Sequence, residues 1–514
     1  MTRWGAGYVT DVTYTTGYYR QQSPSLLSLA CVLNKIAGID ALDDAPLSYL
    51  ELGCGLGYSA MVQAACNPAW QVTAVDFNPA HIAAALALAR EARLANVRFV
   101  EADLASLAED PQSAAIPVAD VVSLHGVWTW VTDDVRRGIV RLLRAKVRTG
   151  GIVHVSYNAL PAWQSALGMQ RVLVEAGRRL ATRSDRQGHA GLQFVQSLLS
   201  AEAGQVKSSP FVVGLLEGLK QATAPEYLAH EYMNEGWKPC FHMDVVADLA
   251  EAKLEWVGSS QPIENFRQLT LTDAQRALLD RFDEPVMWEL IKDMCLARGL
   301  RQDVFARGVR RLTNAERNDA LGDITLALTR LPEHFHYEAS VPAGKATMEA
   351  KFYQPIVTAL GEGPRRVRDL LAMPEVVGRR DNPAELIGLL VGTDQAVPVT
   401  PRPPAADEPG MRLNRVAAKR LATTETPISA VALASTRMGA ALTVPAVELI
   451  VFGKVDAAAG REDLDAWAAE LAPQPDEEER KRAREVLGRI LEERRPVWRR
   501  WGLLDEAGTA SRAG

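Results

Sequence analysis

The chain has 514 residues, and at roughly 150 residues per domain this length predicts several domains. Its hydrophobic share of 47% and charged share of 23% are typical of folded globular proteins, so they argue against disorder or a fibrous repeat. The formal net charge of −6 gives no positive field for a phosphate backbone, and we therefore expect no nucleic-acid partner.

Cysteine usage and hydropathy predict a cytoplasmic protein. The five cysteines form no CxxC pair, which disfavours both a disulfide framework and a structural zinc site. The first residues lack the basic-then-apolar pattern of a signal peptide. No uncharged apolar run approaches the roughly 18 residues of a membrane span, so we expect no membrane partner.

Residues 47–157 alternate short β-branched runs with longer helical patterns, which predicts an α/β fold with a parallel sheet. One helix should begin at Pro79, because Asn78 before it is a favourable N-cap. Another should begin at Asp133 and end at Gly150–Gly151. The expected strands are Leu47–Leu52, Gln71–Asp76, Val97–Glu101, Ala119–Leu124 and Gly151–Tyr157.

A helical insertion should follow this sheet. Residues 163–222 show helical periodicity and almost no strand signal. We expect an insertion over 161–235, near the carboxyl ends of the strands, that caps an acceptor site or forms a dimer contact. Beyond it, LEWVGS (254–259) and ENFRQLTL (264–271) predict an antiparallel pair that completes the sheet.

The C-terminal part has a mainly helical pattern. Residues 285–330 look helical, and three short helical segments followed by AVPVTP within 345–400 predict a winged-helix-like module. We favour a packing role over DNA binding, because no basic helix with base-reading Asn or Gln follows. Residues 401–410 predict a Pro-rich linker or loop, and the charged helix within 475–504 should dock on its own domain.

Glycines follow the first strand in the motif Glu51-Leu-Gly53-Cys-Gly55-Leu-Gly57. A strand that turns sharply into a helix needs glycine where the backbone approaches a ligand closely or adopts a positive φ. The third glycine comes one residue earlier than in the dinucleotide fingerprint, and an acid precedes the first. The motif resembles motif I of class I S-adenosylmethionine (SAM)-dependent methyltransferases, with a generic Rossmann turn as the alternative.

Acids at two later strand ends support this resemblance. In the family the loop with Glu51 and the three glycines faces the amino-acid part of SAM. Asp76 ends the second strand, where a carboxylate can accept both ribose hydroxyls, and Phe77 beside it could cover the adenine. Asp103, followed by Leu104, closes the third strand, where the family's acid meets the adenine amino group. These eight residues are the predicted cofactor-binding set, and SAM is the predicted cofactor.

Two loops on the acceptor side resemble a narrower family. His125-Gly-Val-Trp128-Thr-Trp130-Val follows the fourth strand, and Ser-Tyr157-Asn158-Ala-Leu-Pro-Ala-Trp163 follows the fifth. With the segment around Tyr18, they resemble bacterial methyltransferases that carry a methyltransferase regulatory domain, including the rickettsial lysine methyltransferases that act on outer-membrane protein B. That family's usual wording is H-G-V-Y-S-W-V and S-Y-N-T-x-P-G-W, so this chain differs at Trp128, Thr129 and Ala162.

The resemblance implies a domain plan. Residues 1–160 and 236–272 would form a Rossmann-like SAM-binding methyltransferase domain, interrupted by the helical insertion. A regulatory or middle domain with the winged-helix-like part would span 273–400, and an accessory domain would span 401–514.

Methyl transfer from a sulfonium needs an in-line nucleophile in a water-poor pocket. Trp128, Trp130, Tyr157 and Trp163 could line that pocket, although we expect two of these four to be ordinary core aromatics. His125 could accept a proton from the acceptor or orient its loop. His125, Trp128, Trp130 and Tyr157 are the predicted catalytic residues. Tyr18, Asn158 and Trp163 are the predicted acceptor-binding residues.

N-methylation of protein lysine side chains is the function that the resemblance favours. A small molecule or a peptide natural product is the alternative acceptor, and a non-catalytic SAM-binding regulatory protein is the second alternative. A homodimer would fit the insertion. His230, Glu231, Cys240 and His242 lack the close spacing of zinc ligands, so we expect no metal.

Overall fold

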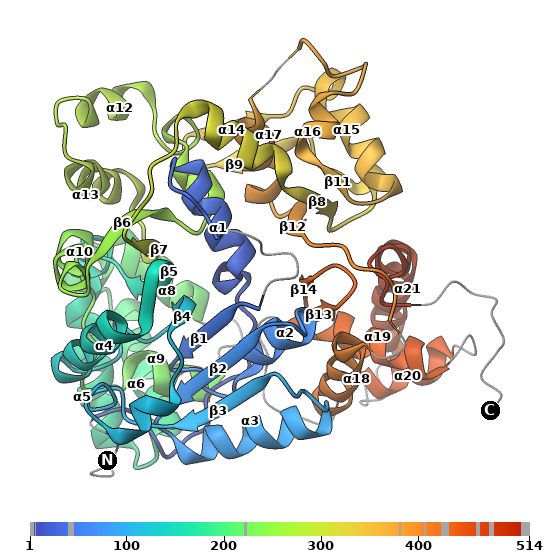
Figure 1. Ribbon diagram of the computed structural model, residues 1–514. Helices are drawn as coiled ribbons and strands as arrows, with labels where there is room; N and C mark the ends of the chain where they lie inside the picture. The colour runs from blue at the N-terminus through green and yellow to red at the C-terminus, as the bar shows by residue number, and fades with distance from the viewer. Residues whose placement is uncertain are drawn as a thin grey trace.

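The computed structural model describes residues 5, 7–39, 46–219, 224–379, 382–405, 408–422, 431–458, 463–471 and 477–504. Figure 1 shows a twisted sheet with flanking helices, a yellow and orange module above it, and a red helical module beside α2 and α3. The predicted order of an α/β sheet followed by mainly helical modules is therefore confirmed.

The main sheet has seven strands in the order β3-β2-β1-β4-β5-β7-β6. The strands from β3 to β5 are parallel, and β7 runs antiparallel to both of its neighbours. The order reverses between β1 and β4, which is where open α/β sheets bind ligands at their carboxyl ends. The strands are β1 Ser48–Leu52, β2 Gln71–Asp76, β3 Val97–Glu101, β4 Ala119–Leu124, β5 Val147–Asn158, β6 Leu254–Ser259 and β7 Leu300–Arg307.

Two sequence predictions about this sheet were wrong. The helix from Asp133 ends at Lys146, and Gly150–Gly151 lie inside β5 instead of stopping the helix. The segment 264–271 is no strand: it contributes the end of a 3-10 turn and the short helix α11 (Arg267–Thr270). The antiparallel partner of β6 is β7, so the sheet extends beyond residue 272.

Helices cover both faces of the sheet. One face packs against α1, α2 and α3, and the other packs against α4 and α10. The predicted start of α3 is confirmed, because the Asn78 side chain accepts a hydrogen bond from the Ala80 N–H and Pro79 is the first helical residue. These helices are α1 Pro24–Leu33, α2 Tyr58–Cys66, α3 Pro79–Glu91, α4 Asp133–Lys146 and α10 His242–Ala250.

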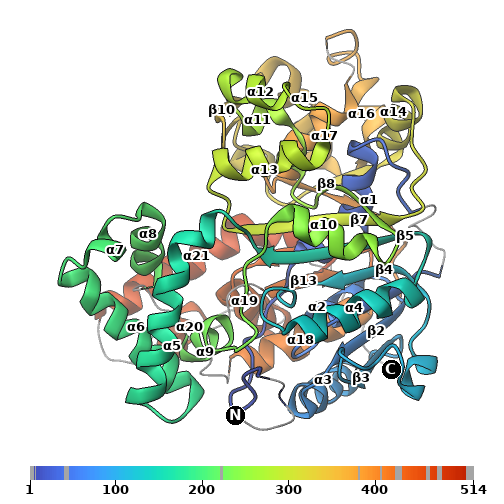
Figure 2. The same ribbon diagram turned by 90° about the vertical axis from the view of Figure 1, so that its left-hand side faces the viewer.

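The segment after β5 is helical, as predicted, and forms a lobe at one side of the sheet (Figure 2). Its apolar core includes Trp163, Leu173 and Leu228, and it also buries Val9 and Val12 from the N-terminal segment. The role of this lobe stays a prediction. Its helices are α5 Leu167–Leu180, α6 Ser184–Ser200, α7 Gly204–Lys207, α8 Pro210–Leu219 and α9 Pro225–Tyr232.

The middle of the chain contains the predicted winged-helix-like arrangement. A three-stranded antiparallel sheet, β11-β8-β12, packs with α14 to α17 around one apolar core. Strands β7 and β8 interrupt the region 285–330 that the sequence predicted as helical. The elements are α12 Asp273–Leu279, α13 Pro285–Leu296, α14 Asn314–Asp323, β8 Thr325–Leu328, β9 Glu338–Val341, β10 Gly344–Thr347, α15 Ala350–Glu362, β11 Arg365–Arg366, α16 Val367–Leu371, α17 Pro383–Gly392 and β12 Ala396–Val399.

The C-terminal module combines a hairpin with four helices. Trp498 is fully buried, meets the Phe452 ring at 5.4 Å and donates its indole N–H to Glu448, which confirms that the helix carrying it docks on its own module. Trp501 is also buried, and its indole N–H bonds the Leu328 carbonyl of the middle module. Its elements are α18 Pro409–Leu421, β13 Val431–Ser435, β14 Ala440–Val444, α19 Ala446–Ala458, α20 Leu464–Leu471 and α21 Glu477–Arg500. Over the described parts of the chain, no helix combines the length and apolarity needed to cross a membrane.

A buried charge network joins β7 to α13 and β5. Arg301 on β7 is fully buried and donates hydrogen bonds to Asp293, Glu289 and Asp303 at 2.8 to 2.9 Å. Tyr157 on β5 donates its hydroxyl to Asp303. Burial alone would raise the pKa of Asp303, but the Arg301 guanidinium holds it well below its ordinary value. The network therefore holds β7 in place between β5 and β6.

We expect Arg301→Met to lower the free energy of unfolding by about 3–5 kcal/mol, because buried carboxylates would lose their cation. Urea denaturation followed by circular dichroism measures this value. Arg311→Met is the control: its side chain is 76% exposed, and its ion pair with Glu255 should contribute less than about 1 kcal/mol. Equal free energies of unfolding for the two variants would contradict the stabilising role of the Arg301 network.

Candidate active site at the carboxyl ends of the parallel strands

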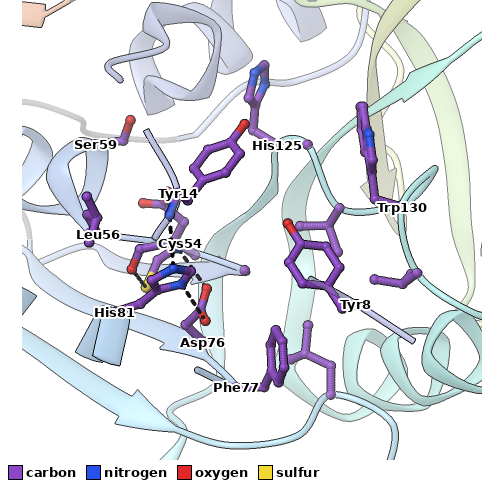
Figure 3. A pocket seen from close by; sticks show the side chains of 18 of the residues that line it. Tyr8, Tyr14, Cys54, Leu56, Ser59, Asp76, Phe77, His81, His125 and Trp130 are labelled. Atoms are coloured by element: carbon purple, nitrogen blue, oxygen red, sulfur yellow. Dashed lines mark hydrogen bonds and ion pairs between the residues drawn. The ribbon is translucent and has the colours of Figure 1, made fainter. Parts of the chain in front are cut away.

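A cavity opens at the carboxyl ends of the parallel strands, at the place where the strand order reverses. Figure 3 shows Tyr14 and the Cys54–Leu56 loop on one side of it, Tyr8 and Trp130 on the other, and Asp76 and Phe77 below. All eight predicted cofactor-binding residues line this cavity. They are Glu51, Gly53, Gly55, Gly57, Asp76, Phe77, Asp103 and Leu104.

The loop after β1 requires its glycines. Gly53, Gly55 and Gly57 have φ values of 72°, 54° and 71°, a region that other residues rarely adopt. A Cβ atom on Gly57 would lie 2.3 Å from the Phe99 ring, and one on Gly53 would lie 2.4 Å from Val127. The loop can therefore approach a ligand with its backbone only because these positions carry no side chain.

Asp76 connects the surrounding segments. One carboxylate oxygen accepts the Gly55 N–H at 2.8 Å, and the other accepts the Asn78 N–H at 2.9 Å. His81 Nδ1 lies 3.2 Å from the same carboxylate, and His81 Nε2 accepts the backbone N–H of Tyr14 at 3.3 Å. Since Nε2 accepts, Nδ1 carries the proton and donates it to Asp76. A carboxylate has about four acceptor positions and three of these are occupied, so Asp76 can accept one further hydrogen bond from a ligand.

Glu51 is a buried acid with an unsatisfied oxygen. Burial, together with the negative charge of Asp76, raises the pKa of Glu51 to about 8. Its Oε2 atom is buried and has no hydrogen-bond partner among the described residues. A cationic group in the cavity would supply that partner and favour the ionised carboxylate.

Aromatic side chains form the remaining wall. The Tyr8 ring meets Phe77 edge-on, with 5.5 Å between centroids, and the Tyr19 ring stacks on His125 at 3.9 Å. Trp130 donates its indole N–H to the Glu231 carbonyl at 3.1 Å. Tyr8, Tyr14 and Tyr19 were not predicted as site residues, because the segment that carries them has no regular periodicity. Its unusual density of tyrosines was the one available signal.

His125 and Trp130 line the cavity, as predicted for catalytic residues. Burial lowers the pKa of His125 to about 4, so the ring is neutral near pH 7. Its Nδ1 atom is buried and lacks a hydrogen-bond partner within the described chain. A neutral ring can accept a hydrogen bond, but an imidazole of such low pKa is a weak base.

The other two predicted catalytic residues do not reach the cavity, and their assignment needs correction. Trp128 is fully buried on the α4 and α10 side of the sheet. Tyr157 points to the same side, where its hydroxyl bonds Asp303 and lies 3.2 Å from His242. Both side chains therefore belong to the core.

The predicted acceptor-binding residues also lie outside the cavity lining. Tyr18 packs in the core beneath α1 and α2. Trp163 donates to the Gly299 carbonyl at 2.8 Å within the core of the helical lobe. Asn158 donates its side-chain N–H to Glu231 Oε1 at 3.2 Å, immediately behind Trp130. In the described residues, no group of His, Cys, Asp or Glu side chains is arranged to hold a metal ion.

Comparisons with known proteins agree with this geometry. Residues 50–151 match the methyltransferase domain family, and residues 224–307 match the predicted methyltransferase regulatory domain. An uncharacterized protein from Synechocystis sp. is 34% identical over 367 residues, which are 71% of each chain. An uncharacterized protein from Rickettsia prowazekii is 26% identical over 210 residues, covering 40% of this chain and 80% of that protein.

A solved structure has the same fold over nearly the whole chain. PKMT2 from Rickettsia typhi in complex with AdoHcy superposes with a TM-score of 0.66 at 16% identity. The match covers 95% of this chain and 99% of that one. The domain matches, the relative that spans most of the chain and the cavity at the strand ends lead to one conclusion: this chain belongs to the SAM-dependent methyltransferases that carry a methyltransferase regulatory domain.

Proposed function

We propose that this methyltransferase transfers the methyl group of SAM to the side-chain nitrogen of lysine residues in proteins. The aromatic wall of the cavity is the observation that carries the proposal, because aromatic faces attract an ammonium cation. The loops after β4 and β5 add support, since they resemble those of lysine methyltransferases. PKMT2 from Rickettsia typhi, whose fold this chain shares, is a further reason to favour a protein acceptor.

The residues around the cavity suit SAM, which supplies a methyl group on a positively charged sulfur. Asp76 has one remaining acceptor position, which suits a ribose hydroxyl, and the unsatisfied oxygen of Glu51 suits an amino cation. Phe77 and Leu104 provide apolar contacts for the adenine, and the Asp103 carboxylate can accept from its amino group. The glycine loop lets the backbone come close to the amino-acid part of the cofactor.

The acceptor side must deliver a neutral amine. A lysine side chain has an ordinary pKa near 10.4 and is protonated at neutral pH, so it has to lose a proton before it can attack the methyl carbon. Burial against Tyr14, Tyr19 and Trp130 would favour the neutral amine by desolvation. His125 can accept a hydrogen bond from the reacting nitrogen. The cytoplasmic location and the homodimer stay predictions.

Asp76→Asn should weaken SAM binding by tenfold or more. The change keeps the size of the side chain but removes the charge that strengthens the hydrogen bond from a ribose hydroxyl, worth about 1.5–3 kcal/mol, and it sets an amide NH2 against one of the two backbone N–H groups that Asp76 accepts. Titration calorimetry measures the affinity. Asp134→Asn is the matched control, because that side chain is 82% exposed on α4 and should leave the affinity unchanged. Unchanged binding by folded Asp76→Asn would remove this role from Asp76.

Glu51 should release a proton when SAM binds near pH 7. Its pKa of about 8 keeps the free acid mostly protonated at pH 7, and an amino cation beside it would favour the carboxylate. Calorimetry in two buffers of different ionisation enthalpy gives the number of protons released. The wild type should release more protons than Glu51→Gln, and the gap should close above pH 9. Equal release by both proteins at pH 7 would place Glu51 away from the amino group.

The lysine acceptor is tested by labelling lysate proteins with an isotopically marked methyl donor. Labelling should rise with pH, because the neutral amine becomes more abundant. It should disappear when the lysines of the same proteins are first chemically acetylated, because the resulting amide nitrogen has no lone pair available to attack the methyl carbon. Mass spectrometry locates the labelled residues. Full labelling of the blocked proteins, or labelling of metabolites alone, would instead favour the small-molecule or peptide alternative.

A further inference from the structure

A second cavity adjoins the cavity at the strand ends. It is formed by residues 18–21, residues 329–331 and parts of β12, β14 and α21, and we call it the inter-module cleft. The middle and C-terminal modules approach each other there, at β12 and β14 (Figure 1). Tyr19 lines both cavities, and its ring stacks on His125 with 3.9 Å between centroids. A side chain that passes Tyr19 from the cleft would therefore enter the first cavity beside His125.

The inter-module cleft is large enough for a short segment of polypeptide. Its volume is about 860 Å³, in the upper part of the range of roughly 300–1,000 Å³ that is usual for ligand sites. Tyr18, one of the residues predicted to bind the acceptor, lines it. Because the cleft meets the first cavity at Tyr19, it suits the residues that flank an acceptor lysine, while the lysine side chain itself extends past Tyr19.

Two arginines of the cleft are held by carboxylates. Arg20 forms an ion pair with Asp394. Arg494 donates hydrogen bonds to the Glu448 carboxylate and to the Thr329 carbonyl, each at 2.8 Å. The charges of both guanidinium groups are therefore balanced by the protein itself.

Arg330 lines the same cleft without such a partner. Over the residues that the structure describes, its guanidinium forms no ion pair, and its Nε atom is buried and has no hydrogen-bond partner. Burial and the positive charge of Arg494 lower the pKa of Arg330, although Asp394 acts in the opposite direction. An anionic side chain in the cleft would supply the missing partner and offset the repulsion from Arg494.

The cleft also contains carboxylates that face no arginine. Glu333 and Glu493 line it and form no ion pair within the described parts of the chain. Glu333 is exposed, so water can solvate its charge, whereas the buried Nε of Arg330 has no such access. A segment that carries both an acid and a lysine therefore matches the charges of the cleft better than a segment of one sign.

A third cavity borders the glycine loop and lies between α3 and α18. Its two arginines already have carboxylate partners: Arg183 pairs with Asp185, and Arg420 pairs with Glu91. This cavity therefore offers an incoming anion no guanidinium that lacks a carboxylate, and we favour the inter-module cleft as the route of the acceptor.

We propose that the inter-module cleft binds a segment of the acceptor protein, with an acidic side chain of that segment on Arg330 and the acceptor lysine beyond Tyr19. This inference rests on the proposed lysine methylation and specifies its acceptors as lysines with Asp or Glu nearby in the sequence. The acid accepts hydrogen bonds from the planar fork of the guanidinium, whose Nε is otherwise unsatisfied. The middle and C-terminal modules thereby take part in the choice of substrate.

Arg330→Met tests this role, because methionine keeps an apolar stem and removes the guanidinium. Labelling of lysines in lysate proteins with an isotopically marked methyl donor should fall about tenfold, and calorimetry should show unchanged SAM affinity. Arg183→Met is the matched control: that arginine lines the third cavity, is 58% exposed and should leave both values unchanged. Lysine labelling by folded Arg330→Met at the wild-type level would overturn the inference.

Synthetic peptides provide a test that needs no variant to fold. They copy the most strongly labelled lysine site, with the neighbouring acids either kept or replaced by alanine. The wild type should methylate the alanine peptide about tenfold less efficiently, through a higher KM with kcat unchanged. Equal kcat/KM for both peptides would overturn the inference. Failure of the lysine proposal has a different signature, because the wild type would then label no lysine at all.

Charge reversal distinguishes direct pairing from a structural role of Arg330. A third peptide carries lysine in place of the neighbouring acids, and Arg330→Glu should methylate it more efficiently than the wild type does. A structural role would lower the activity of Arg330→Glu on every peptide alike, and that result would overturn the inference.

Discussion

The carboxylate of Asp76 holds together the three segments that enclose the cavity. It accepts N–H groups from Gly55 and Asn78, so it ties the loop after β1 to the start of α3. Through His81 it also holds the backbone of Tyr14, which brings in the aromatic N-terminal segment. The positive φ at Gly55 belongs to the turn that presents its N–H to this acid. The glycine loop and Asp76 therefore hold each other in position, although the loop follows β1 and Asp76 ends β2.

Local chemistry explains why the residues predicted to bind the cofactor all line the cavity, whereas most of those predicted for the acceptor do not. A glycine motif or an acid at a strand end depends on its immediate neighbours, and all eight predicted residues line the cavity. Trp128 follows the end of β4 and Tyr157 lies near the end of β5, but their side chains turn to the α4 and α10 face. Which face a side chain takes depends on packing partners such as His242 and Asp303, which lie far away in the sequence.

Strand β7 was not predicted for a similar reason, because its stability also depends on partners far away in the sequence. Buried strands are usually apolar, whereas LRQDVFAR carries Arg301 and Asp303 in its first half. These charges are tolerated in the core because α13 supplies Asp293 and Glu289 opposite Arg301. The segment 264–271 was predicted as a strand, yet its backbone completes a 3-10 turn and forms the helix α11. Pattern alone thus favoured the wrong partner for β6.

The C-terminal module holds the helix α2, which follows the glycine loop. Tyr58, the first residue of α2 after the glycine loop, donates its hydroxyl to the Ala432 carbonyl in β13. At the other end of α2, Thr436 and Arg402 donate to the carbonyls of Ala65 and Cys66, which lack helical partners in the last turn. Both ends of this helix are therefore held by residues more than 300 positions away. A displacement of the C-terminal module would have to break these bonds or move α2 and the glycine loop with it, so this module is mechanically coupled to the cavity.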